Sequence, residues 1–173
     1  MSIQIPFRMF EVWRACDTNC FRYEGLACVQ IKSDGQRLTL TASDRAIIAS
    51  ASTGCAAGPF TCYLHRDAAK IIARTGGKIV LENGVIKAGN LSFATMPDSA
   101  AFFPRIIDSI GFKPGYYHPG TAAHNTLFAI ASRAILADTF SSVRLGEISE
   151  FVGDSAGVEF RFVVMSATKR EKK

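Results

Sequence analysis

Long apolar runs are missing from this sequence: none reaches the roughly 18–20 residues that a membrane-spanning helix requires. The N-terminus, MSIQIPFRMFEVWRA, lacks the charged-then-apolar order of a signal peptide, so we expect a cytoplasmic protein. There is also no glycine-rich phosphate loop and no Gly-x-Ser-x-Gly nucleophile elbow. The sequence therefore contains no motif of the common nucleotide-binding proteins or of the common hydrolases.

Metal-binding and catalytic patterns are equally scarce. The five cysteines form no CxxC pair, which favours buried free thiols, and a zinc site built from Cys16, Cys20 and the histidines would be poorly spaced. His65, His118 and His124 are scattered, and ordinary polar or capping roles suit them better than catalysis. We expect no metal, no cofactor and no enzyme activity. A small enzyme with a Cys–His pair stays open as an alternative, because such partners meet only in space.

The positive charge of the chain is concentrated at its end. The net charge is +5, and the final stretch KREKK contributes +3 of it. The remaining +2 does not by itself indicate a nucleic-acid partner, so the placement of the cations matters more than their number.

Residues 58–104 contain one complete structural pattern. Turn residues separate the expected elements: Gly76-Gly77 ends a helix, and Asn83-Gly84 and Gly89-Asn90 connect short strands. The expected order is a strand at 60–64, a helix at 65–75, and strands at 78–82, 85–88 and 91–95. In the helix, Ala68, Ile71 and Ile72 have the spacing of a buried face.

The same order of helix and three strands is expected twice more. The first copy has a helix at 7–16, with Phe7, Phe10 and Trp13 on its apolar side, and strands at 26–32, 37–42 and 46–52. The last copy has a helix at 121–140 and strands at 142–145, 148–153 and 158–167. With 48% apolar residues, the chain can bury a sizeable core around these elements.

These patterns predict an α+β fold in which helices cover one face of antiparallel sheets. We expect residues 1–104 to form a domain of two motifs and residues 121–167 to form a third motif. Residues 105–120 would be a linker, and residues 168–173 a basic tail.

Three short segments resemble signatures of the bacterial DNA sliding clamp, the DNA polymerase III beta subunit. LTLTASDR at 38–45 resembles a strand and loop of that family, although Ser43 replaces the usual Thr and the Gly-His before the Arg is absent. FATMPDSAAFFP at 93–104 resembles the end of a clamp domain. FVVM at 162–165 resembles the start of the C-terminal segment, which continues differently here. The resemblance implies a clamp-like fold of repeated helix and β-meander motifs, in a short relative such as a phage or mobile element encodes.

The resemblance also implies that the helices face duplex DNA. From the residues alone, Arg66, Lys70 and Arg74 recur every fourth position and form a basic row, which is equally typical of a solvated helix face. In a clamp, such cations would hold duplex phosphates without reading sequence. The DNA-binding residues would be Arg8, Arg14, Arg66, Lys70, Arg74 and Arg133.

A second site implied by the resemblance is an apolar pocket for a short peptide from a DNA polymerase or clamp loader. A flexible methionine among apolar side chains suits shallow peptide anchoring, whereas an ordinary strand core would explain the same residues. The pocket would be formed by Arg45, Ala46, Ile47, Val163, Val164 and Met165.

The number of motifs bears on assembly. Three motifs do not make a whole number of two-motif domains, so we expect a sheet edge to seek a partner and the chain to form a homo-oligomer. The expected function is a DNA-holding processivity factor that tethers a polymerase. The alternative is a clamp-fold protein that forms no ring and competes for clamp partners.

Overall fold

The computed structural model describes residues 2–16, 24–43, 47–97, 139–145 and 148–165. Three helices lie in these ranges: the 3-10 helices η1 (Phe7–Ala15) and η2 (Glu24–Ala27), and the α-helix α1 (Arg66–Thr75). The strands are β1 (Ser2–Pro6), β2 (Cys28–Ser33), β3 (Arg37–Ser43), β4 (Ile47–Gly54), β5 (Phe60–His65), β6 (Lys78–Glu82), β7 (Val85–Ala88), β8 (Leu91–Ala94), β9 (Met96–Pro97), β10 (Thr139–Leu145), β11 (Ile148–Ser155) and β12 (Val158–Met165).

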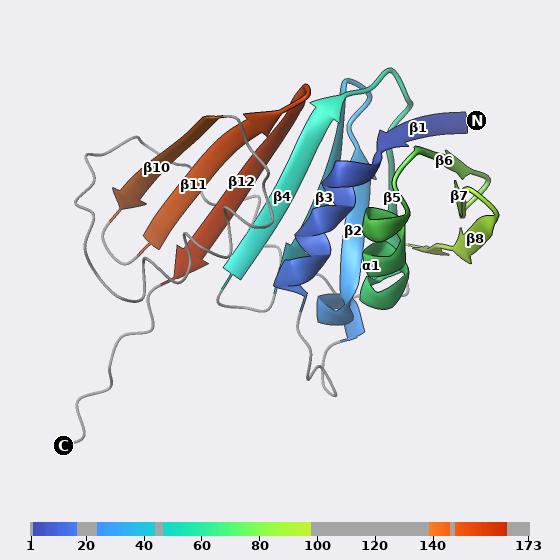
Figure 1. Ribbon diagram of the computed structural model, residues 1–173, viewed down its shortest axis with the longest axis horizontal. Helices are drawn as coiled ribbons and strands as arrows, with labels where there is room; N and C mark the ends of the chain where they lie inside the picture. Colours follow the sequence, from blue (N-terminus) through green and yellow to red (C-terminus); the bar gives the residue numbers. More distant parts are fainter. Residues whose placement is uncertain (1, 17–23, 44–46, 98–138, 146–147, 166–173) are drawn as a thin grey trace.

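The strands form two antiparallel sheets (Figure 1). One sheet has the order β1-β6-β7-β8, and the other has the order β10-β11-β12-β4-β3-β2-β5-β9. The predicted α+β class is confirmed, and every predicted strand is present with small shifts at its ends. No helix among the described residues is long and apolar enough to cross a membrane.

The first two motifs have the same order of elements and exchange their first strands. Each motif runs as one strand, a helical segment and three further strands, from β1 to β4 and from β5 to β8. The helical segment is α1 in the second motif, and in the first it consists of η1 followed by the short η2. Strand β1 pairs with β6 of the second motif, and β5 pairs with β2 of the first motif. Sequence analysis missed β1, although Ile3 and Ile5 alternate with exposed residues as a half-buried strand should.

The third motif continues the larger sheet. Its strands β10, β11 and β12 form a meander, and β12 pairs with β4 of the first motif. The predicted helix at 121–140 is wrong at its end, because Thr139 and Phe140 belong to β10. The rest of that helix, the linker at 105–120 and the tail at 168–173 lie outside the described residues, so the domain division stays a prediction.

The helices η1 and α1 lie side by side over the strands of the larger sheet (Figure 1). Their buried side chains join one core cluster with residues from both sheets. In η1, Met9, Val12 and Ala15 recur at three-residue steps, which is the spacing of one face of a 3-10 helix. The predicted face was only partly correct: Phe10 is buried, but Phe7 and Trp13 are half-buried.

The buried face of α1 also differs from the prediction. Ala69, Ile72 and Ala73 are buried, whereas Ile71 is 44% exposed and Ala68 is half-buried. The spacing of apolar residues correctly predicted that Ile72 is buried. It also predicted that Ile71 is buried, whereas the smaller Ala69 and Ala73 take that place in the core. Close packing of this helix therefore depends on small residues as well as on isoleucine.

The hairpin turn between β6 and β7 is confirmed. Asn83 and Gly84 have φ angles of 51° and 74°, and a type I′ turn needs positive φ at both central residues. Ala156 and Gly157, between β11 and β12, have φ angles of 52° and 78°. Sequence analysis gave no such turn there, because alanine rarely adopts this conformation.

The two adjacent isoleucines of α1 provide a matched test of this packing. We expect Ile72→Ala to lower the free energy of unfolding by about 2–5 kcal/mol, because a fully buried side chain is removed. Ile71→Ala should lower it by only about 1 kcal/mol, since 44% of Ile71 is already exposed to solvent. Urea denaturation followed by circular dichroism measures both values. Equal losses in the two variants would contradict the observed orientation of α1.

Candidate nucleic-acid interface

Three cations follow one flank of α1. Arg66, Lys70 and Arg74 are spaced four residues apart, so they lie one above another on the helix surface. Arg66 and Lys70 are half-buried, and Arg74 is exposed. The row runs beside the buried face rather than opposite to it, because Ala69 and Ala73 are its immediate sequence neighbours.

A tryptophan of η1 connects this row to the neighbouring helix. The Lys70 Nζ atom lies 5.4 Å from the centroid of the Trp13 ring. The Arg14 Cζ atom lies 5.2 Å from the same centroid. Both distances are within the range of a cation–π contact, which is about 6 Å. Cations from two helices therefore gather around one half-buried aromatic ring. We call Arg14, Arg66, Lys70 and Arg74 the cation row.

Two carboxylates lie beside the cation row. The Arg14 Nε atom donates to Glu11 Oε2 at 2.7 Å, and the Arg66 Nε atom lies 3.6 Å from Asp67 Oδ1. Ion pairs in such exposed positions stabilise a fold by only about 0–1 kcal/mol, so they constrain these arginines weakly. The two acids reduce the net positive charge of the two-helix surface without abolishing it.

The N-terminus of α1 is capped by a histidine. The His65 Nδ1 atom accepts a hydrogen bond from the Asp67 backbone N–H at 3.3 Å, which satisfies one of the free amides of the first turn. The predicted capping role of His65 is thereby confirmed. His118 and His124 lie outside the described residues.

Arg8 and Arg133 do not join the cation row in the described structure. Arg8 is half-buried on η1 and donates a hydrogen bond from Nη1 to Ser155 Oγ at the end of β11. Ser155 is itself buried, so this contact connects η1 to the hairpin between β11 and β12. Arg133 lies outside the described residues.

The two segments expected to form a peptide pocket lie next to each other. In the antiparallel pairing of β4 with β12, Ile47 is opposite Val164 and Ile48 is opposite Val163. Val163 is buried, with 4% of its surface exposed, and Met165 ends β12. Arg45 and Ala46 lie outside the described residues. Segments separated by more than a hundred residues are thus brought together by strand pairing.

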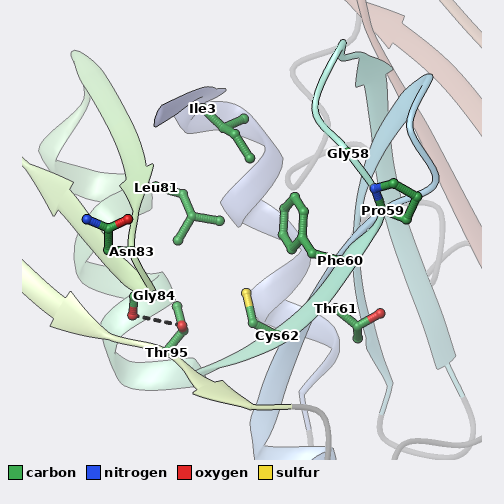
Figure 2. A pocket seen from close by; sticks show the side chains of 10 residues that line it. All are labelled: Ile3, Gly58, Pro59, Phe60, Thr61, Cys62, Leu81, Asn83, Gly84 and Thr95. Atoms are coloured by element: carbon green, nitrogen blue, oxygen red, sulfur yellow. Dashed lines mark hydrogen bonds between the residues drawn. The ribbon is translucent and has the colours of Figure 1, made fainter. Parts of the chain in front are cut away.

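A separate cleft opens between the two sheets where β5 faces β1 and β6. Its volume is about 290 Å³, and Figure 2 shows Ile3, Leu81 and Phe60 pointing toward one another across it. The other lining residues are Gly58, Pro59, Thr61, Cys62, Asn83, Gly84 and Thr95. The cleft could not be predicted from the sequence, because four separate segments of the chain form it.

The cleft gives no support to thiol catalysis. Burial raises the pKa of the Cys62 thiol, and a hydrogen bond with the Thr95 side chain opposes that shift only in part. A raised pKa keeps the thiol protonated at neutral pH, and the protonated form is a poor nucleophile. The residues lining this cleft include no histidine. Within the described ranges, no group of three or more His, Cys, Asp or Glu side chains could hold a metal ion.

Comparison with solved structures identifies the architecture. No protein-family model matches the sequence, and no curated protein matches it either. The DNA polymerase sliding clamp of Pseudomonas aeruginosa superimposes with a TM-score of 0.66 at 13% identity, covering 96% of this chain and 66% of that chain. The DNA polymerase III beta subunit of Thermotoga maritima gives 0.63 at 11% identity, with 98% and 66% covered.

A third bacterial structure agrees with these two. The pol III beta of Caulobacter crescentus gives a TM-score of 0.60 at 13% identity and covers 99% of this chain and 68% of that chain. All three are named as clamps or as polymerase beta subunits. The chain spans about two thirds of the length of these structures. Its repeated strand–helix–meander motifs therefore have the fold of the bacterial DNA sliding clamp, as the three sequence segments indicated.

Proposed function

We propose that the chain is a sliding-clamp-like processivity factor that holds duplex DNA against η1 and α1 and tethers a polymerase. The observation that carries the proposal is the gathering of Arg14, Lys70 and their neighbours on two adjacent helices of a clamp fold. Phosphates are the natural partners of such a surface, since Lys and Arg release condensed counterions when they neutralise DNA.

The chemistry of the cation row suits sequence-independent holding. Long cationic side chains contact phosphates, which position a protein on DNA but carry no base identity directly. Glu11 and Asp67 lower the net charge of the surface, which keeps the affinity modest. The phosphate contacts that remain are weakened by added salt, because salt screens exposed charges. A surface that must move along DNA benefits from contacts that are numerous but individually weak. Arg8, on η1, and Arg133 would add further cations to the DNA-binding set.

The tethering site would lie where β4 meets β12. We assign it to Arg45, Ala46, Ile47, Val163, Val164 and Met165. The strand register supports this assignment, because Ile47 pairs opposite Val164. The occupant would be a short peptide of a DNA polymerase or clamp loader. Its apolar side chains would be anchored by the apolar end of β12 and the adjacent loop.

Self-association would complete the assembly. Strand β8 ends the smaller sheet and β10 ends the larger one in the described part of the chain, so each has an edge without a neighbouring strand there. Leu91 of β8 is 44% exposed, which adds apolar surface at that edge. Strand edges of this kind pair readily with another chain, and contacts between unlike edges can close a ring of copies.

A non-ring clamp-fold protein that competes for clamp partners is the second candidate. One observation favours it: the fold is that of a clamp but the identity to the solved clamps is only 11–13%, so their fold can be kept while their function differs. Such a protein would keep the peptide site but would need neither the cation row nor self-association.

A charge-removal experiment tests the DNA-holding function. In the triple variant Arg66→Ala, Lys70→Ala, Arg74→Ala, duplex affinity should fall for every sequence. The slope of log K against log salt should flatten by about one for each lost phosphate contact. Fluorescence anisotropy of a labelled duplex across a salt titration measures both quantities. Alanine at these positions preserves the helix, because it has the highest helix propensity.

The matched control removes three cations elsewhere. Lys32, Lys78 and Lys87 are exposed and alternate along β2, β6 and β7 with buried residues, so they lie on the outer faces of the sheets. Their triple alanine variant has the same net charge as the test variant. If both variants lost the same duplex affinity, the loss would be due to net charge and not to the position of the cations on α1. If the test variant kept the duplex affinity of the parent, the proposal would be contradicted.

The mass of the particle in solution tests self-association. We expect light scattering at tens of micromolar to give a mass above that of one 18.7 kDa chain, with or without a short duplex. A monomer at all concentrations that binds a polymerase peptide but no DNA would favour the competitor function instead.

The tethering site is tested with a synthetic peptide taken from the clamp-binding segment of a bacterial replicative polymerase. We expect Met165→Ala to weaken peptide binding about tenfold, a typical loss for one apolar anchor, and to leave duplex affinity unchanged. Met96→Ala, in the distant strand β9, is the matched control and should bind like the parent. Isothermal titration measures the affinities. Identical affinities for parent and Met165→Ala would place the anchor elsewhere.

A further inference from the structure

The only tryptophan of the chain lies among the cations that the proposed function assigns to DNA. Trp13 is half-buried on η1 and packs against the main core cluster, so its ring is held in place from below. Lys70, from the neighbouring helix, and Arg14, from its own helix, both place their charged groups near this ring.

From this contact we propose that Trp13 is a positioning residue for phosphate binding, and this inference rests on the proposed DNA-holding function. The ring attracts both cations through its negative face, and it holds them at a fixed place between the two helices. Both charges lie within 5.4 Å of one centroid, so their separation cannot exceed twice that distance.

The physical benefit is preorganisation. Lysine and arginine have long side chains that lose rotamer freedom when they bind a phosphate, and this loss weakens binding. A ring that restrains Lys70 and Arg14 before DNA arrives removes part of that loss. The ion pair of Arg14 with Glu11 is made through Nε, and a guanidinium can in addition bind a phosphate through its two terminal nitrogens.

The arrangement favours positioning over base stacking. Aromatic residues that bind single strands offer their face to a base. Here two cationic groups already lie close to the Trp13 ring, and the ring packs against the core. Trp13 therefore acts on DNA through its neighbours rather than by touching a base.

A mutant cycle on the full chain tests the inference. Trp13→Leu keeps an apolar side chain but removes the aromatic face, and we expect duplex affinity to fall about two- to fivefold. Trp13→Phe should retain part of the affinity, since phenylalanine keeps a weaker aromatic face. In a background that already carries Arg14→Ala and Lys70→Ala, Trp13→Leu should have no further effect. Anisotropy with a labelled duplex measures all affinities, and circular dichroism checks the folding of each variant.

The outcomes separate the inference from the function on which it rests. If the parent binds no duplex, the DNA-holding function is wrong and this role of Trp13 falls with it. If the parent binds but Trp13→Leu has the same effect with and without the two cations, Trp13 is only a packing residue. A larger loss for single-stranded than for duplex DNA would overturn positioning in favour of stacking. If Trp13→Leu fails to fold, the same cycle is run with Trp13→Phe. We then expect a partial loss of duplex affinity in the parent and no loss in the background that carries Arg14→Ala and Lys70→Ala.

Discussion

The exchange of first strands between the two N-terminal motifs is the constraint on which the rest of the structure depends. Strand β1 completes the sheet of the second motif, and β5 completes the sheet of the first. Helix η1 directly follows β1 and α1 directly follows β5, so the crossing brings these two helices into contact. The meeting of Trp13 with Lys70 is a result of this crossing, because neither helix carries both residues.

The two candidate sites share a structural element. Strand β4 packs against η1 through one face and pairs along its edge with β12, which carries the segment assigned to peptide binding. Arg8 adds a direct link from η1 to Ser155 beside the β11–β12 turn. The helices of the proposed DNA site and the strands of the proposed peptide site are therefore parts of one packed unit rather than independent modules. A change in the packing of β4 would reach both.

Much of the fold could be predicted from sequence because its signals are local. The Asn83-Gly84 turn and the alternation in strands such as β6 are properties of a few adjacent residues. What failed was not local: Ile71 and Ile72 are equally apolar, and only contacts with η1 and the sheets decide which of them is buried. The spacing of Arg66, Lys70 and Arg74 in α1 could be read from the sequence, but the contact of Lys70 with Trp13 depends on how two helices pack together. Nothing in the sequence indicated the cleft at Cys62, since distant strands form its walls.

The strand exchange also governs the order in which the chain can fold during synthesis. Ile3 is paired with Leu81, so β1 must wait for its partner until the second motif has been translated. At about 5–20 residues per second, this delay lasts several seconds, during which an apolar strand lacks its partner. Contacts so distant along the chain also slow folding, because the intervening loop must close before they form. The first motif therefore cannot reach its final structure before the second has emerged, and the two are expected to fold and unfold as one cooperative unit.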